Sequence, residues 1–176
     1  MNKLITSAVF VLGGLWFLSS CLFVVDQRQF ALVFALGEIK RVVQEPGLYF
    51  KLPQPLQNIV FLEKRILTID TPDADRFITK EKQNVVVDTY VKWRIEDAKL
   101  FYTSVAGRVA SANDRISRAL RDGLNNEIAT RTVNDVISGE REEVMEKVTQ
   151  RVAVDAEQIG VKIVDVRLRK VDFADE

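Results

Sequence analysis

The chain has 176 residues, and its 25 Lys and Arg residues balance 25 Asp and Glu residues, so the formal net charge is zero. Such a balance gives no overall field that would hold nucleic acid, and no basic tract interleaved with aromatics is present. The sequence contains no histidine and one cysteine, Cys21. This excludes Ser/His/Asp and Cys/His nucleophiles, His-containing zinc sites and an intrachain disulfide. We therefore expect no nucleic-acid partner, cofactor or metal.

The N-terminal segment 4–25 carries no charged residue. A helix of this length, rising about 1.5 Å per residue, would span roughly 33 Å, which is enough to cross the apolar core of a bilayer. Residues 1–25 are therefore predicted to be a single-pass membrane anchor. Its main lipid contacts are expected from Leu4, Phe10, Leu12, Leu15, Trp16, Phe17, Leu18, Leu22, Phe23 and Val25. Because Lys3 precedes the segment, the positive-inside rule favours a cytoplasmic N-terminus, with the bulk of the chain across the membrane.

Two other fates of this segment stay open. A cleaved secretory signal has an apolar stretch of only about 7 to 15 residues, and no small-x-small site precedes a polar mature start here. Residues 18–21, Leu-Ser-Ser-Cys, resemble a bacterial lipoprotein processing site, in which Cys21 would carry the lipid. Four further apolar residues follow that cysteine, so an uncleaved anchor fits the segment better.

The next part of the chain has the patterns of strands. Apolar runs and alternating residues predict five strands, over residues 29–36, 39–43, 58–62, 65–70 and 84–95. In the last of these, every second residue is apolar or Thr, which is typical of a sheet covered on one face. The pair Pro46-Gly47 predicts a turn in which Gly47 has a positive φ, and the charged residues 79–83 predict a solvated turn.

From residue 96 the apolar period changes from 2 to 3.6. Asp97 is expected to cap a short helix ending near Ser104, and capping boxes at 111–114 and 132–135 open a longer helix and a short turn. The two longer helices carry apolar stripes: Ile116, Leu120, Leu124 and Ile128 in the first, and Val144, Val148, Val152 and Ile159 over residues 140–159. In the second, Glu143 and Lys147 are expected to pair across one turn. Gly160 is predicted to end this helix in the left-handed conformation.

Residues 161–171 return to a strand, with Val164, Val166 and Leu168 expected to face inward. Strands followed by helices predict an α+β fold. We expect a strand-rich subdomain over residues 26–95 and a helix-rich subdomain with a closing strand over residues 96–176.

Little in the sequence indicates catalysis. The carboxylate pairs Asp73/Asp75 and Glu142/Glu143 are typical of solvated surfaces, and the sequence has no phosphate-binding loop or nucleophile elbow. We therefore expect no catalytic residue. A hydrolase using Ser and Lys is the alternative from a different class.

The apolar residues that follow the Pro-Gly pair allow two interpretations. Tyr49 or Phe50 together with Leu52 could pack under the sheet as ordinary core. Alternatively, this loop dips into the face of the same bilayer that holds the anchor. The membrane contacts would then be Leu48, Phe50, Leu52 and Leu56.

An anchor followed by FALVFALGEIKRVVQEPGLYFKLP (residues 30–53) resembles the start of the SPFH or Band 7 superfamily, which includes stomatin, prohibitin, flotillin and the HflK/HflC proteins. Within it, ADRFITKEKQNVVVDTYVKWRIED (residues 74–97) and IGVKIVDVRLRKVDF (residues 159–173) resemble the HflC branch. The resemblance implies an anchor followed by a two-part SPFH domain. It also implies that a long coiled-coil region, which does not occur in these 176 residues, follows the final strand.

The resemblance further implies a non-enzymatic protein of the bacterial inner membrane, with a cytoplasmic N-terminus and a periplasmic bulk. Its implied partners are HflK, membrane lipid and further copies in a large hetero-oligomer that encloses and regulates the membrane AAA protease FtsH. A stomatin-like membrane organiser that partners a different protease is the alternative. As a hypothesis, the charges for contacts between subunits are Arg115, Arg118, Arg121, Asp165, Arg167 and Arg169.

Overall fold

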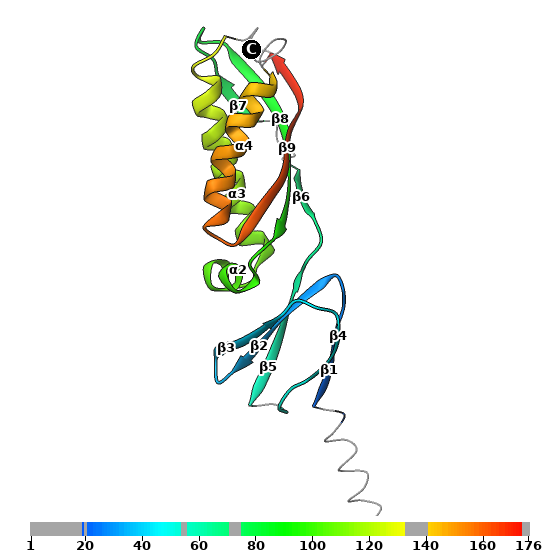
Figure 1. The fold of residues 1–176 in the computed structure, drawn as a ribbon. Helices are drawn as coiled ribbons and strands as arrows, with labels where there is room; N and C mark the ends of the chain where they lie inside the picture. Colours follow the sequence, from blue (N-terminus) through cyan, green and yellow to red (C-terminus); the bar gives the residue numbers. More distant parts are fainter. Residues whose placement is uncertain (1–18, 20, 54–55, 71–74, 133–140, 174–176) are drawn as a thin grey trace, which may run out of the picture. The chain divides into compact units, whose positions relative to one another are not determined.

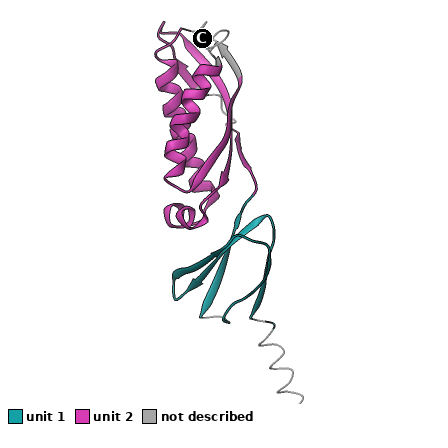
Figure 2. Ribbon diagram, viewed as in Figure 1, with its two compact units in different colours: residues 1–64 teal, residues 65–176 magenta. Residues whose placement is uncertain are grey.

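A computed structural model describes residues 19, 21–53, 56–70, 75–132 and 141–173. The chain divides into two compact units, residues 1–64 and 65–176 (Figure 2). The predicted α+β class is confirmed by the mixture of strands and helices. The predicted boundary at residues 95/96 does not match this division. The strand that ends at residue 95 pairs along most of its length with the closing strand, so both belong to the second unit.

The first unit is built from two small antiparallel sheets (Figure 1). Strand β1 (Leu22–Val25) pairs with β4 (Gly47–Phe50), and β2 (Gln29–Ala35) lies between β3 (Glu38–Val43) and β5 (Gln57–Glu63). Both sheets contribute to one apolar core, which consists of Phe23, Val25, Ala31, Val33 and Val43 with the partly buried Tyr49 and Ile59.

The predicted anchor helix is wrong at its C-terminal end. Residues 22–25 form β1 instead, and Phe23 and Val25 point into the core of the first unit. The sequence does not distinguish the two, because a short run of apolar residues fits a strand as well as a buried helix.

The remaining predicted anchor residues, Leu4, Phe10, Leu12, Leu15, Trp16, Phe17 and Leu18, lie outside the described residues. Among the helices in the part of the chain that the structure describes, none combines the length and apolar character needed to cross a bilayer.

The second unit is a four-stranded sheet with helices on one face (Figure 1). Strand β8 (Asn84–Ile95) is central: β6 (Leu67–Asp70) and β7 (Asp75–Ile78) pair with its two halves on one side, and β9 (Val161–Phe173) pairs along the other. The helices are α2 (Ala98–Val105), α3 (Val109–Ile128) and α4 (Arg141–Glu157). As predicted, the buried face of β8 consists of Val85, Val87, Thr89, Val91, Trp93 and Ile95, and both helical stripes are buried.

Two predicted caps had different outcomes. The Asp97 carboxylate caps α2 as expected, accepting hydrogen bonds from the backbone N–H groups of Lys99 at 2.9 Å and Leu100 at 3.0 Å. The predicted capping box at residues 111–114 is wrong, because α3 begins earlier, with Arg108 as an N-cap that makes no side-chain capping bond. Starting earlier lets α3 bury Ala112 in line with its apolar stripe. The second predicted box extends into residues outside the described ranges.

The predicted turn at Gly47 is also wrong. Gly47 has an extended backbone, with φ 159°, and is the first residue of β4. Strands β1, β4 and β7 are absent from the prediction made from the sequence. The turn after β7 is present as predicted, although its first residue, Thr79, is buried and accepts a backbone hydrogen bond from Gln83.

Strand β9 contains two register shifts. Lys92 pairs with Asp165 while Trp93 pairs with Ile163, which leaves Val164 as an extra residue. Val164 is therefore 45% exposed, and its predicted inward position is wrong, whereas Val166 and Leu168 are buried as predicted. Such a β-bulge reverses which residues face each side of the sheet, and its position depends on the partner strand. A second shift leaves Arg169 as the extra residue.

Gly160 connects the end of α4 to the start of α2. It has φ +71°, as predicted, and its carbonyl oxygen accepts hydrogen bonds from the backbone N–H groups of Glu96 and Asp97, both at 3.0 Å. A Cβ atom at this position would lie 2.5 Å from the carbonyl oxygen of Asp97 and 2.9 Å from the backbone nitrogen of Phe101. Only glycine fits without a backbone shift.

We expect Gly160→Ala to destabilise the chain by about 3 kcal/mol or more, because it adds a clash with backbone atoms to the cost of a left-handed alanine. Gly37→Ala is the matched control, since Gly37 also has a positive φ, +90°, but a Cβ atom added there would have no neighbouring atom within 4 Å. The control should lose only about 1 to 2 kcal/mol. Urea unfolding measures both, and equal losses would contradict the close approach at Gly160.

Candidate interaction surfaces

The ribbon formed by β1 and β4 has apolar side chains on both faces. Its inner face supplies Phe23 and Val25 to the core. Its outer face consists of two directly opposed pairs, Leu22 with Phe50 and Val24 with Leu48. These four side chains are exposed by 46%, 61%, 68% and 64%, respectively. We call them the outer ribbon face. A continuous apolar patch of this kind usually marks a contact with a membrane or another protein.

The structure shows which residues after the Pro-Gly pair pack in the core and which are exposed. Tyr49 packs on the core, with its ring 5.8 Å from that of Phe23. All four predicted membrane-contact residues are exposed instead: Leu48, Phe50, Leu52 and Leu56. The core-packing interpretation therefore holds for Tyr49 but not for Phe50 or Leu52.

The outer ribbon face lies directly beside the end of the uncharged N-terminal stretch. The backbone N–H of Lys51 donates to the carbonyl oxygen of Cys21 at 2.7 Å, which joins the end of β4 to the residue before β1. Residues 4–20, the uncharged stretch that remains outside β1, immediately precede this point. The Cys21 side chain is buried, so a lipid-bearing Cys21 would have to leave its place in the fold.

The three candidate charges on β9 already have partners within the chain. Arg167 Nε lies 2.9 Å from an Asp165 carboxylate oxygen. The Arg169 guanidinium lies 3.0 Å from Asp70 and 3.7 Å from Asp88. Any contact of these side chains with another subunit would have to compete with pairs that are already formed.

The candidate arginines on α3 are placed differently. Arg115, Arg118 and Arg121 are all exposed on α3, which belongs to the helical layer on one face of the sheet, whereas Asp165, Arg167 and Arg169 belong to strand β9 within the sheet (Figure 1). The structure therefore does not bring the six candidate residues together. Among the described residues, Arg115 and Arg118 form no ion pair, which leaves both guanidinium groups available for a partner.

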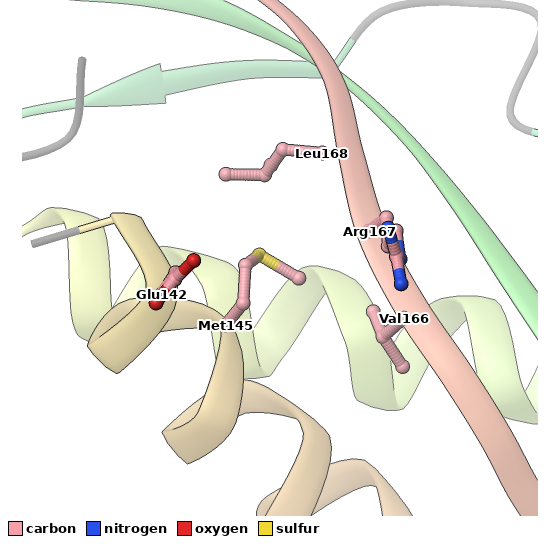
Figure 3. A pocket seen from close by; sticks show the side chains of 5 residues that line it. All are labelled: Glu142, Met145, Val166, Arg167 and Leu168. Atoms are coloured by element: carbon pink, nitrogen blue, oxygen red, sulfur yellow. The ribbon is translucent and has the colours of Figure 1, made fainter. Parts of the chain in front are cut away.

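The neighbouring carboxylates Glu142 and Glu143 of α4 have different surroundings. Glu142 lines a hollow of about 410 Å³ between α4 and β9, together with Met145, Val166, Arg167 and Leu168 (Figure 3). Hydrogen bonds from Lys147 and then Arg131 lower the pKa of Glu143, so this carboxylate remains charged at neutral pH and is not a proton donor there. The predicted pair of Glu143 with Lys147 is confirmed at 2.8 Å. Within the described ranges, no group of three or more His, Cys, Asp or Glu residues could hold a metal ion.

The profile of the SPFH domain / Band 7 family matches residues 23–176. The chain belongs to this family. The protein named HflC in Haemophilus influenzae is 34% identical over 186 residues, covering all of this chain and 62% of that relative. HflC of Vibrio parahaemolyticus is 29% identical over 213 residues, again covering all of this chain and 64% of the relative.

In Escherichia coli K12, the protein named Modulator of FtsH protease HflC is 32% identical over 148 residues, covering 80% of this chain and 43% of the relative. The predicted resemblance to the HflC branch of the SPFH superfamily is thus confirmed. The SPFH chain spans about three fifths of the length of the Haemophilus and Vibrio relatives.

Sequence reasoning missed part of the outer ribbon face. The sequence places Leu22 in the predicted anchor and does not mark Val24 as a contact residue. In both segments, 22–25 and 47–50, every second side chain is an apolar residue that faces outward. This pattern indicates a shared outer face only once the two segments are known to pair.

Two phenylalanines of this SPFH chain test the orientation of the ribbon. Phe23 faces the core and Phe50 faces outward. We expect Phe23→Ala to destabilise the first unit by about 3 kcal/mol, because it removes a buried aromatic ring. Phe50→Ala should change stability by less than about 0.5 kcal/mol in solution. Chemical unfolding compares the two, and equal losses would mean that β1 and β4 do not present opposite faces as described.

Proposed function

We propose that this SPFH chain is a non-enzymatic membrane scaffold that, with an HflK-type partner, forms a large complex enclosing and regulating an FtsH-type protease. The proposal rests on family membership and on similarity to proteins named HflC, one of which is named a modulator of the FtsH protease. The location that goes with it is the bacterial inner membrane, with a single span, a cytoplasmic N-terminus and a periplasmic bulk.

The outer ribbon face is the observation that carries the membrane part of the proposal. Four exposed apolar side chains lie on a ribbon joined by a backbone hydrogen bond to the end of an uncharged stretch. If residues 4–20 span the bilayer, Leu48 and Phe50 lie within a few residues of its surface. Burying this face in the boundary between headgroups and acyl chains removes it from water and holds the first unit against the membrane.

Regulation would then follow from position rather than chemistry. Copies fixed at one height by the anchor pack side by side, and the resulting barrier limits which substrates reach the protease. For the lateral contacts, Arg115 and Arg118 are better candidates than the paired charges of β9. A single exposed ion pair contributes only about 0 to 1 kcal/mol, but a closed ring repeats each contact in every copy.

Gentle detergent extraction of the protein from its native membrane tests the scaffold proposal. We expect a large complex in which mass spectrometry identifies an HflK-type partner and an FtsH-type protease. A complex containing a different protease would favour the stomatin-like organiser. A small species with neither partner would contradict the proposal.

Charge reversal tests the lateral contact. We expect Arg115→Glu/Arg118→Glu to reduce the complex to smaller species, because each interface would lose two attractive contacts. Arg167→Glu should have a smaller effect, since Arg167 is paired within the chain. Lys99→Glu/Lys162→Glu is the matched control with the same change of charge at exposed sites. Sizing of the extracted complex measures all three, and an intact complex in the double α3 variant would exclude this surface.

A further inference from the structure

The first unit contains a basic hollow of about 260 Å³ beside the outer ribbon face. Three cationic side chains and no acidic one are among its lining residues. The full lining is Val33, Lys40, Arg41, Phe50, Lys51, Leu52 and Gln57. A concave site that combines positive charges with apolar side chains is complementary to an anionic phospholipid, whose charged headgroup adjoins apolar acyl chains.

A β-bulge allows two neighbouring cations to line the same hollow. Val33 pairs with Arg41 while Phe34 pairs with Ile39, so Lys40 is an extra residue on β3. In a regular strand, successive side chains point to opposite faces. The bulge redirects one of them, and Lys40 and Arg41 both reach the hollow as a result.

The Arg41 guanidinium is held in place. One of its nitrogens donates to the carbonyl oxygen of Phe50 at 2.7 Å, and the group lies 5.8 Å from the centre of the Tyr49 ring. A guanidinium has five N–H donors, so most remain available for an anion. A fixed guanidinium loses little freedom on binding, and its charge-assisted bonds to phosphate are among the stronger hydrogen bonds in proteins.

The position of the hollow in the chain favours a membrane lipid over free phosphate as its ligand. Lys51, which lines the hollow, is hydrogen-bonded through its backbone to Cys21, directly after the uncharged residues 4–20. Phe50 belongs to both the hollow and the outer ribbon face. We propose that this hollow binds the phosphate of an anionic phospholipid whose acyl chains lie against the outer ribbon face. This inference rests on the membrane position proposed above.

The test uses the full chain reconstituted in bilayers of equal parts phosphatidylglycerol and phosphatidylcholine. Native mass spectrometry counts the lipids that stay bound after detergent extraction. We expect the wild-type chain to retain phosphatidylglycerol in excess. Lys40→Gln/Lys51→Gln should reduce that excess by up to about fivefold for each lysine removed. Arg41 is left unchanged because it also bonds Phe50. Lys80→Gln/Lys99→Gln, a matched pair of exposed lysines in the second unit, should behave as wild type.

Three results would overturn the site. The first is retention of both lipids in equal amounts by the wild-type chain, and the second is an unchanged phosphatidylglycerol excess in the Lys40/Lys51 variant. The third is complete displacement of the lipid when inorganic phosphate is added as a competitor, which would indicate a site for the free anion. Vesicle flotation separates this failure from failure of the membrane position. A chain that floats without lipid preference lacks only the site, whereas a chain that does not float lacks the membrane position as well.

Discussion

The antiparallel pairing of β8 with β9 is the interaction on which the larger unit depends. Its register extends from Val85 opposite Phe173 to Ile95 opposite Val161, so the end of the described chain returns to the strand that precedes all three helices. The helices between them must fit within this closed segment, and they cover the one face of β8 that is apolar. Gly160 makes the closure tight, because its carbonyl oxygen joins the strand end to the first residues of the α2 cap.

The smaller unit follows a different constraint, because its β1–β4 ribbon is apolar on both sides. The inner side completes a small core, and the outer side has no cover within the described residues of that unit. A soluble domain would place polar residues at every second position of such a ribbon. Leu22, Val24, Leu48 and Phe50 occupy those positions instead. This composition is costly in water and favourable at a bilayer surface, so the ribbon is the part of the fold that best supports the membrane attachment proposed above.

The features predicted from sequence are those in which one periodicity extends over many residues. The alternation in residues 84–95 and the helical stripes starting at Ile116 and Val144 each depend on a single buried face, so pattern alone places them. The end of the anchor and both bulges of β9 could not be predicted in this way. Four apolar residues fit helix and strand equally, and a bulge exists only relative to the register of another strand. The basic hollow could not be predicted for the same reason, because Lys40 lines it only as the extra residue of a bulge in β3.

The surface chemistry of the two units therefore suits them to different parts of the proposed scaffold function: the first unit to membrane attachment and the second to contacts between copies. The first presents apolar side chains next to cations, which is complementary to the interface of an anionic bilayer and, in the proposal, fixes where a copy sits. The second presents charges, and because those on β9 are paired within the chain, the proposed lateral contacts rest on exposed arginines such as Arg115 and Arg118, whose single ion pairs are weak. Weak contacts suffice once the membrane confines the copies to a plane, because confinement raises their effective concentration. In the proposed scaffold, attachment and assembly are thus coupled, and we expect loss of the outer ribbon face to weaken the proposed complex without altering any residue that would join one copy to the next.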